Sequence, residues 1–258
     1  MKRRTKKSAE MSMWDHLKEL RKVLLLSAYA VAFGTVGGWA LSDMVYRLLA
    51  WPIAGLQGVN FITTTPMEPI FVKLKVSLVV GVVIGLPIVV WQLWSFILPA
   101  LKNNEKKTVY FMAFWSLFLF LCGTAFSFLV VLPMGLKFLL FAGGGSVESI
   151  PFITKSSYLN FILTFLISFG LVFQLPIVLL LLIRLGHLTP KTLAKHRKWA
   201  FFIIVIVAVI ISPTPDLITQ LLMAGPMYML YEMSIWLGYL VVRKANKRVT
   251  SETMVKEG

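Results

Sequence analysis

The sequence is poor in charged residues, in acidic residues above all, and in cysteine. Only 14% of its 258 residues are charged and 58% are hydrophobic, whereas soluble domains have about 25% charged and 45–50% apolar residues. So few charges cannot cover a water-soluble protein of this length, which excludes a soluble enzyme and a disordered chain. The single cysteine, Cys122, excludes an internal disulfide and a multi-cysteine metal site.

Catalytic and cofactor-binding motifs are also missing from the sequence. It contains no His-Glu-x-x-His zinc motif, no Gly-x-Ser-x-Gly nucleophile motif and no nucleotide-binding loop. The three histidines, His16, His187 and His196, are too dispersed to suggest a metal or haem site. We therefore expect no enzymatic activity and no cofactor. An intramembrane hydrolase is disfavoured because no nucleophile–base pair is visible.

Long uncharged runs are what the sequence has in abundance. Runs of 20, 26, 29 and 28 residues lie between Lys22 and Asp43, Lys75 and Lys102, Lys107 and Lys137, and Lys155 and Arg184. Each exceeds the roughly 18 apolar residues that indicate a membrane-spanning helix. Two weaker segments follow, a 13-residue run at Trp199–Ile211 and Leu217–Val242. At about 1.5 Å per residue the first of these reaches roughly 20 Å, short of a ~30 Å hydrocarbon core.

The distribution of basic residues predicts the orientation in the membrane. Of the 26 lysines and arginines, 21 lie on the side of the two termini and five on the opposite side. Cytoplasmic loops carry the excess of basic residues in membrane proteins. We therefore predict an all-α polytopic membrane protein of the cytoplasmic membrane, with six transmembrane helices, the last two short, and both termini cytoplasmic. A re-entrant hairpin of the last two segments fits the same charge pattern.

We interpret the chain, residues 1–258, as a single membrane domain with three parts. These are a basic leader with an amphipathic cytoplasmic helix (1–22), a six-span bundle (23–242) and a basic cytoplasmic tail (243–258). The basic runs set the topology and contact anionic lipid headgroups. The run from Lys2 to Lys7 has none of the interleaved aromatic residues that nucleic-acid binding favours, so we expect no nucleic-acid partner.

Acidic residues at the ends of the segments have ordinary structural interpretations. The spacing of Glu19 and Lys22 predicts an ion pair on a helix surface. Glu105 is a solvated charge among three lysines in the loop between the second and third segments. Asp216, with Gln220 one turn later, fits a helix N-terminus after a proline-rich turn.

Polar residues inside the segments are harder to explain. Glu232 lies in an apolar segment that also contains Pro226, where an ionised side chain costs about 2.5–3.5 kcal/mol. It is either paired with a backbone or hydroxyl donor or the proton-coupled site of a secondary transporter. Gln174 stands two residues before Pro176, a residue that kinks helices and frees carbonyl groups. In the outer loop, two flanking prolines stiffen the chain around Glu68.

Motifs along the whole chain resemble those of one family. They are His16-Leu17-Lys18-Glu19-Leu20-Arg21, Pro66-x-Glu68-Pro69, Gln92-x-Trp94-x-Phe96-Ile97-x-Pro99-Ala100-Leu101, Glu105-Lys106-Lys107, Ser212-Pro213-x-Pro215-Asp216, Gln220, Pro226 and Tyr231-Glu232. In this order, from about Trp14 to Tyr239, the chain resembles TatC, the multispanning subunit of the twin-arginine protein translocase. Two departures are Ala100 in the usual Pro-Gly-Leu and Gln174 where members often have Glu.

The resemblance implies a function and a set of partners. TatC-type chains bind twin-arginine signal peptides of folded substrates and export them with TatA-like, and in some systems TatB-like, single-span proteins, using the proton-motive force. The resemblance also implies a homo-oligomer within a larger complex. The implied signal-peptide-binding residues are Glu19, Glu105, Leu17, Arg21, Phe96 and Pro99. The implied partner-docking residues are Ile210, Ser212, Asp216 and Gln220.

Elementary chemistry agrees with these implied roles. Two adjacent arginines need carboxylates, and each Arg–carboxylate pair can be bidentate. The implied role as arginine-binding carboxylates replaces the ion-pair interpretation of Glu19 and the solvated-charge interpretation of Glu105. Polar groups that face lipid are costly, so Ser212 and Gln220 are expected to need a polar partner in the membrane. Thr214, in the turn between the two short segments, is expected at the outer surface.

Overall fold

The computed structural model describes residues 13–54, 60–97, 106–142, 152–212, 214 and 216–257. Its elements in chain order are α1 (Met13–Leu49), α2 (Trp51–Ala54), β1 (Asn60–Ile62), α3 (Glu68–Ile97), α4 (Lys106–Phe126), η2 (Ser127–Val131), α5 (Leu132–Lys137), η3 (Phe138–Ala142), β2 (Phe152–Thr154), α6 (Lys155–Val172), α7 (Leu175–Arg184), α8 (Pro190–Lys195), α9 (Arg197–Ile211) and α10 (Leu217–Glu257). The two η segments are π-helical. Helices therefore dominate the fold, as the sequence predicts.

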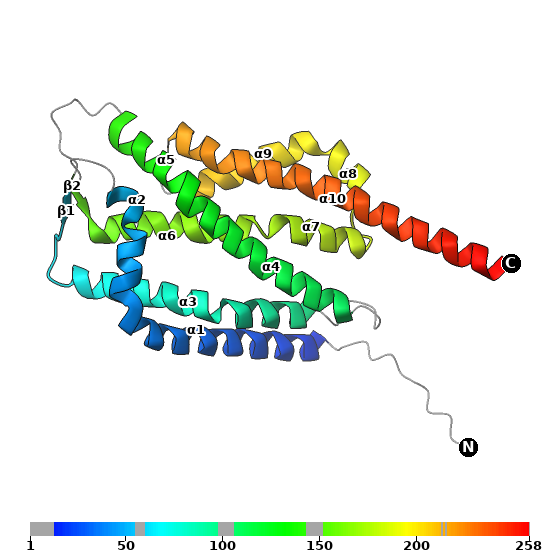
Figure 1. The fold of residues 1–258 in the computed structure, drawn as a ribbon, viewed down its shortest axis with the longest axis horizontal. Coiled ribbons are helices and arrows are strands. Elements are labelled where there is room, and N and C mark those ends of the chain that lie inside the picture. Colours follow the sequence, from blue (N-terminus) through cyan, green and yellow to red (C-terminus); the bar gives the residue numbers. More distant parts are fainter. Residues whose placement is uncertain are drawn as a thin grey trace, which may run out of the picture.

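A pair of short strands is the part of the fold that the sequence did not predict. β1 and β2 pair in parallel, with Asn60 opposite Phe152 and Ile62 opposite Thr154. Because β1 leads into α3 and β2 leads into α6, the pairing ties the starts of these helices together at one end of the molecule (Figure 1). Three-residue strands are too short to leave a periodic pattern in the sequence.

Four helical stretches are long and apolar enough to cross a membrane. They are His16–Ile53, Glu68–Phe96, Tyr110–Leu140 and Lys155–Arg184, which correspond to the first four predicted segments. α9 and α10 are not among them. The 15 residues of α9 reach only about 22 Å at 1.5 Å per residue, and the apolar part of α10 is interrupted by Glu232.

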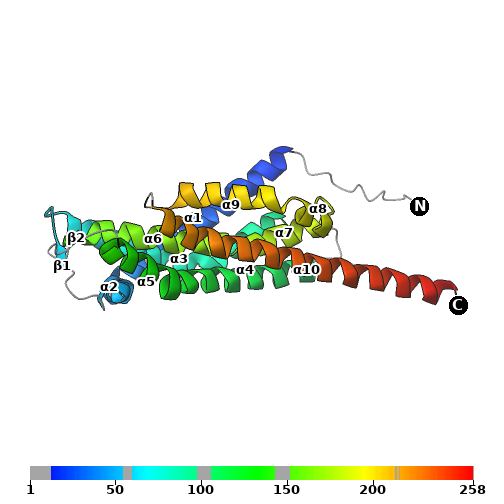
Figure 2. The ribbon, with the colours of Figure 1, turned by 90° about the horizontal axis from the view of Figure 1, so that it is seen from above.

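The long helices run back and forth between two ends of the molecule. The strands and α2 lie at one end, and the start of α1 and the end of α10 lie at the other (Figure 1). Seen from above, α9 and the first half of α10 run beside each other, and the turn that joins them lies toward the strand end (Figure 2). α1, α4 and α9 begin at the end opposite the strands, and α3, α7 and α10 end there (Figure 1). The chain therefore alternates in direction in the order that the sequence predicts.

The first helix is longer than the first predicted segment. α1 runs without a break from Met13 to Leu49, and so it crosses the boundary that we expected between the leader and the bundle at residues 22 and 23. The reason is local, because Leu, Lys, Arg, Glu and Ala are good helix formers. Neither glycine nor proline occurs between Met13 and Phe33.

Glycines bring α1 and α3 into close contact. A Cβ atom added to Gly34 would lie 2.8 Å from the carbonyl oxygen of Gly81. One added to Gly81 would lie 2.6 Å from the Val31 carbonyl oxygen, and one added to Gly38 would lie 2.8 Å from that of Ser77. Small residues at such positions let the backbones of membrane helices approach closely. The position of α1 on α3 therefore depends on these glycines.

The fourth segment is interrupted at its proline, as expected. α6 ends at Val172, and α7 begins at Leu175 with Pro176 as its second residue. Proline is tolerated there because the first turn of a helix does not use its amide hydrogens. α3 and α10, in contrast, continue through Pro87 and Pro226.

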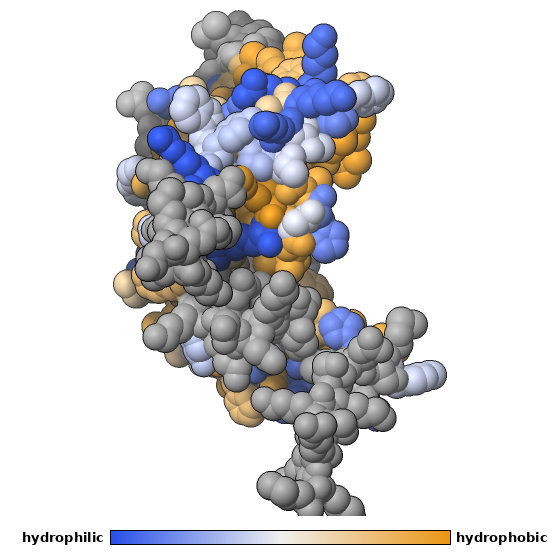
Figure 3. Space-filling view, turned by 90° about the vertical axis from the view of Figure 1, so that its right-hand side faces the viewer, coloured by the Kyte–Doolittle hydropathy of each residue, from blue (hydrophilic) through white to orange (hydrophobic). Residues whose placement is uncertain are grey.

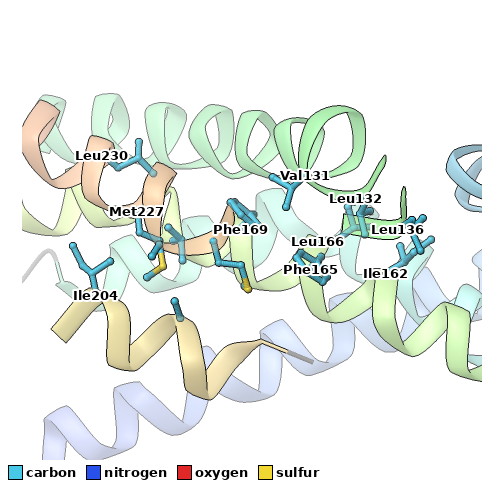
Figure 4. Packing of buried hydrophobic residues seen from close by; sticks show 14 of the residues in the cluster. Val131, Leu132, Leu136, Ile162, Phe165, Leu166, Phe169, Ile204, Met227 and Leu230 are labelled. Carbon is cyan, nitrogen blue, oxygen red and sulfur yellow. The ribbon is translucent and has the colours of Figure 1, made fainter. Parts of the chain in front are cut away.

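The packed interior is centred on α6. Leu159, Ile162 and Phe165 of this helix are fully buried, and Phe169 is 1% exposed. Leu132 and Leu136 of α5 lie on one side of α6, and Met227 and Leu230 of α10 belong to the same cluster (Figure 4). Outside this cluster, large apolar side chains such as Phe33 are exposed. On helices of this length such a surface is suited to lipid rather than to water.

Candidate functional site

The first candidate surface is formed where the start of α1 meets the end of α3. The rings of His16 and Phe96 stack with centroids 4.2 Å apart and planes 20° apart. Glu19 is one turn further along α1, and residues three apart share a helix face. Glu19 therefore lies on the same face of α1 as the stacked His16 ring. Leu17 and Arg21 are exposed on the neighbouring faces of α1.

The Glu19 side chain is half-buried, and its carboxylate forms no ion pair or hydrogen bond within the described residues. The ion pair with Lys22 that the spacing predicts does not form, and within the described part of the chain no hydrogen bond to this carboxylate is present. The helix-surface interpretation of Glu19 therefore loses its support. A carboxylate that is partly removed from water without a partner is available to a cationic ligand.

Two further predicted residues, Pro99 and Glu105, lie outside the described residues. Glu105 immediately precedes Lys106, the first residue of α4. Their contribution to the surface around Glu19 and Phe96 stays a prediction from the family resemblance.

Basic residues gather at the same end of the molecule. Arg184, Lys191, Lys195 and Lys198 are all exposed and form no ion pair within the described ranges. Hydrophilic side chains cover the upper part of this end, where α8 and the start of α9 lie (Figure 3). A mostly positive surface repels cationic ligands in general, so a carboxylate within it selects ligands that can form specific bonds.

Glu232 is paired across two helices. Arg197 Nε lies 2.8 Å from Glu232 Oε1, and Arg197 Nη2 donates to Oε2 at 2.9 Å. Tyr228, one turn earlier on α10, donates its hydroxyl to Oε1 at 3.0 Å. The predicted hydroxyl partner is thus present, but the arginine 35 residues away was missed. Such full pairing favours a structural role for Glu232 over that of a proton carrier.

The turn between α9 and α10 satisfies its own polar groups. Asp216 accepts from the Thr219 amide at 2.8 Å and from the Thr219 hydroxyl at 2.6 Å. Ser212 donates to the Thr214 carbonyl at 2.7 Å. Burial raises the pKa of the Asp216 carboxyl, but hydrogen bonds with Thr214 and Thr219 outweigh burial and leave that pKa below its usual range. The expected helix N-terminus at Asp216 is thereby explained.

Replacing Asp216 by Ala is expected to lower the free energy of unfolding by about 1 kcal/mol, because the first turn of α10 loses its capping acceptor. Asn can accept the same amide hydrogen bond and should retain most of the stability. Thermal unfolding in detergent measures both variants. Equal loss in the two variants would contradict the capping role.

The partner-docking residues from the sequence separate into two kinds. Ser212 and Asp216 are engaged inside the turn, so neither needs an external hydrogen-bond partner. Ile210 is 75% exposed on α9. Gln220 is half-buried on α10, and its side chain makes no hydrogen bond within the described residues. Of the three polar residues in this set, Gln220 is thus the one that needs an external polar partner.

Gln174 bridges two helices inside the bundle. Its side-chain oxygen accepts from the Ser116 hydroxyl, and its amide nitrogen donates to the Ser116 carbonyl at 3.0 Å. The bridge connects α4 with the turn between α6 and α7. Because the amide supplies both a donor and an acceptor, Gln174 satisfies Ser116 without carrying a charge into the membrane.

Glu68, the first residue of α3, connects the segment before this helix to the start of α6. It is 5% exposed and accepts from the amides of Thr64 at 2.8 Å and Ser156 at 2.9 Å. Pro66 is exposed in the turn before α3. These bonds, next to the strand pair, indicate that Glu68 holds the strand end of the molecule together.

Comparisons with known proteins agree on one family. Residues 15–226 match the family model described as Sec-independent protein translocase protein (TatC). The chain is 39% identical over 235 residues to the TatC protein of Aquifex aeolicus, covering 91% of this chain and 97% of that protein. It is 33% identical over 251 residues to TatCy of Bacillus subtilis, covering 96% and 97%.

The structure has a similar solved counterpart. It superimposes with a TM-score of 0.78 on a crystal structure of the twin-arginine translocase receptor TatC, at 39% sequence identity. The match covers 88% of this chain and 99% of that chain. The two chains therefore share the same fold over most of their length.

Proposed function

The chain belongs to the TatC family of Sec-independent protein translocase proteins, and we propose that it is the subunit that recognises twin-arginine signal peptides. It is a membrane protein and a component of the twin-arginine translocase. In our proposal it acts as a receptor without enzymatic activity or cofactor, in the cytoplasmic membrane. Folded substrates then cross with TatA-like and TatB-like partners, driven by the proton-motive force.

The observation that carries the proposal is the half-buried Glu19 side chain, whose carboxylate has no partner among the described residues. It lies beside the His16–Phe96 stack, on a molecular end that is otherwise rich in positive charge. Each arginine of a signal peptide can donate two parallel hydrogen bonds to a carboxylate. Glu19 and Glu105 together supply one carboxylate for each arginine. Export of a twin-arginine reporter in cells that lack their own TatC tests the proposal, and the expected result is restored export.

We also propose that both termini are cytoplasmic and that α9 and α10 complete six spans. Support comes from the excess of basic residues at the end where α1 begins and α10 ends (Figure 1). The short α9 then requires local thinning of the bilayer, or shielding by protein, around a ~22 Å helix.

Thr214 is expected at or just below the outer surface, since the turn joins the two short helices. A Thr214→Cys variant in intact cells should react with a membrane-impermeant thiol reagent, while the native Cys122, half-buried within α4, stays unlabelled. Labelling of residue 214 only after permeabilisation would instead support a re-entrant hairpin.

We propose that the outer half of α9 and the start of α10 bind the single helix of a TatA-like partner. Ile210 supplies exposed apolar surface, and the Gln220 side chain supplies a polar group without a partner in the described part of the structure. Hydrogen bonds between membrane helices contribute about 0.6–2 kcal/mol each.

A photocrosslinker at Ile210 or Gln220 should therefore capture a TatA-like protein in native membranes, because both side chains face the proposed partner helix. The same probe at Phe33, an exposed apolar residue of α1, serves as the matched control and should capture mainly lipid. Capture of lipid alone at all three positions would rule out docking at α9 and α10.

A further inference from the structure

α9 is attached to the rest of the molecule by little buried surface. Only Ile204 and Ala208 of its 15 residues are buried, and its principal neighbour is α10. Phe202 and Ile203 are each 57% exposed, and Ile210 is 75% exposed. A helix with so few buried contacts needs another feature to fix its position along its neighbour.

Apolar contact alone does not provide that feature in a membrane. Lipid tails are as apolar as the side chains that they replace, so burial against a neighbouring helix adds no hydrophobic driving force. Van der Waals packing still opposes sliding or rotation of α9 on α10, but with only Ile204 and Ala208 of α9 buried it distinguishes weakly between neighbouring registers. Directional polar contacts are therefore the features that distinguish most sharply between one register and its alternatives.

Two sets of polar contacts hold α9 against α10, one at the start of α9 and one just after its end. At the turn end, Ser212 lies 3.5 Å from the Thr219 hydroxyl. At the other end, the Arg197–Glu232 pair described above connects the first residue of α9 to α10. Arg197 is 14 residues before the end of α9, and Glu232 is 15 residues after the start of α10. The stretch of α9 from Arg197 to the turn and the stretch of α10 from the turn to Glu232 are thus both about 21–22 Å long. The ion pair therefore joins the two helices at equal distances from the turn.

The geometry of the pair makes it sensitive to register. The planar guanidinium binds both carboxylate oxygens in a fixed orientation. Tyr228 holds one of these oxygens from the same helix as Glu232, and the rings of Tyr228 and Phe201 of α9 meet edge-on at 5.6 Å. A shift of α9 by one residue, about 1.5 Å, would break both parallel hydrogen bonds.

We propose that Arg197 and Glu232 are positioning residues that set the register of α9 against α10, and thereby place the outer half of α9 for a partner helix. The placement of α9 for a partner rests on the proposed docking function, whereas the register of α9 against α10 does not. Neither residue needs to touch the partner, because Arg197 and Ile210 lie at opposite ends of α9.

The register is tested by a disulfide between cysteines at Ile204 and Met227, which lie in the same buried cluster on α9 and α10 (Figure 4), in a Cys122→Ala chain. Arg197→Glu and Glu232→Arg should each lower the oxidation yield roughly fivefold, within the range of polar contacts between membrane helices. The double variant, with the charges exchanged, should restore the yield. If reversal variants fail to accumulate, Glu232→Gln, which keeps the shape, should lower the yield about twofold.

The matched control is Lys198→Glu, which reverses a neighbouring exposed charge that has no ion pair in the described part of the chain. Its disulfide yield should equal that of the parent chain. Native yields in Arg197→Glu and Glu232→Arg would overturn the proposal. Loss in both single variants without recovery in the double variant would also overturn it, because the two residues would then act separately.

Photocrosslinking from Ile210 in the same variants tests whether the register of α9 places it for a partner helix. Capture of a TatA-like partner should fall about fivefold in each single variant and return in the double variant. Unchanged capture despite a lost disulfide would overturn the link between register and docking. Absence of capture in the parent chain would refute the proposed docking function, and the disulfide yields would still decide the register.

Discussion

Replacing Glu19 by Gln is expected to block export of twin-arginine substrates while the protein stays inserted and abundant. The variant keeps the shape of the side chain and removes only its charge. A charge-assisted hydrogen bond contributes about 1.5–3 kcal/mol when it is partly desolvated, and a freely exposed pair only about 0–1 kcal/mol. Because Glu19 is half-buried, signal-peptide binding should weaken about ten- to hundredfold, as measured by export of a reporter.

Glu105→Lys is expected to have the same effect, because it replaces the second proposed carboxylate by a charge that repels arginine. Lys22→Gln is a suitable control, since Lys22 is exposed on α1 and forms no ion pair with Glu19. Export should then remain close to native. Native export by a chain with both Glu19→Gln and Glu105→Gln would return both residues to the solvated-charge interpretation.

Replacing Gly81 by Ala is expected to force α1 away from α3. The added Cβ would lie 2.6 Å from the Val31 carbonyl oxygen and 2.6 Å from the Thr35 amide nitrogen. Both are backbone atoms, so a side-chain rotation cannot relieve the contact. Overpacking of this kind costs about 1–3 kcal/mol, and Gly81→Leu should prevent the protein from accumulating. Thermal unfolding in detergent and protein abundance measure the two effects.

Gly37→Ala is the matched control for this interface. Gly37 is in α1, three residues after Gly34, but a Cβ added there meets nothing within 4 Å. Its stability should equal or exceed that of the native chain, because Ala favours helix more than Gly does. Similar losses in Gly81→Ala and Gly37→Ala would mean that helix propensity, and not close packing of α1 on α3, determines the stability.

The features that the sequence predicted correctly depend on residues close together in the chain. Charges bound each of the first four predicted spans, and the bounds of the third and fourth recur in the structure within three residues. The first span is longer at both ends than its uncharged run, and the second begins and ends about six to seven residues earlier. Pro176 interrupts the fourth segment where expected. The expected amphipathic helix and the first span form one continuous helix, α1, since no helix-breaking residue lies between them.

Contacts between distant residues could not be predicted from the pattern. Arg197 and Glu232 are 35 residues apart, and Ser116 and Gln174 are 58 apart. Nothing in the spacing of either pair indicates contact, since each depends on how two helices pack. The role of Glu19 is a different case, because its spacing favoured an ion pair with Lys22 that the structure does not contain. Only the resemblance to TatC directed attention to it.

The most direct test of signal-peptide recognition uses the purified chain and a twin-arginine peptide that carries a photocrosslinker. The peptide should be captured by the chain alone, and a Lys-Lys version should be captured about tenfold less, because lysine cannot form two parallel bonds with a carboxylate. Capture should disappear when Glu19→Gln and Glu105→Gln are combined. Equal capture of the two peptides, or native capture by the double variant, would contradict recognition by these carboxylates.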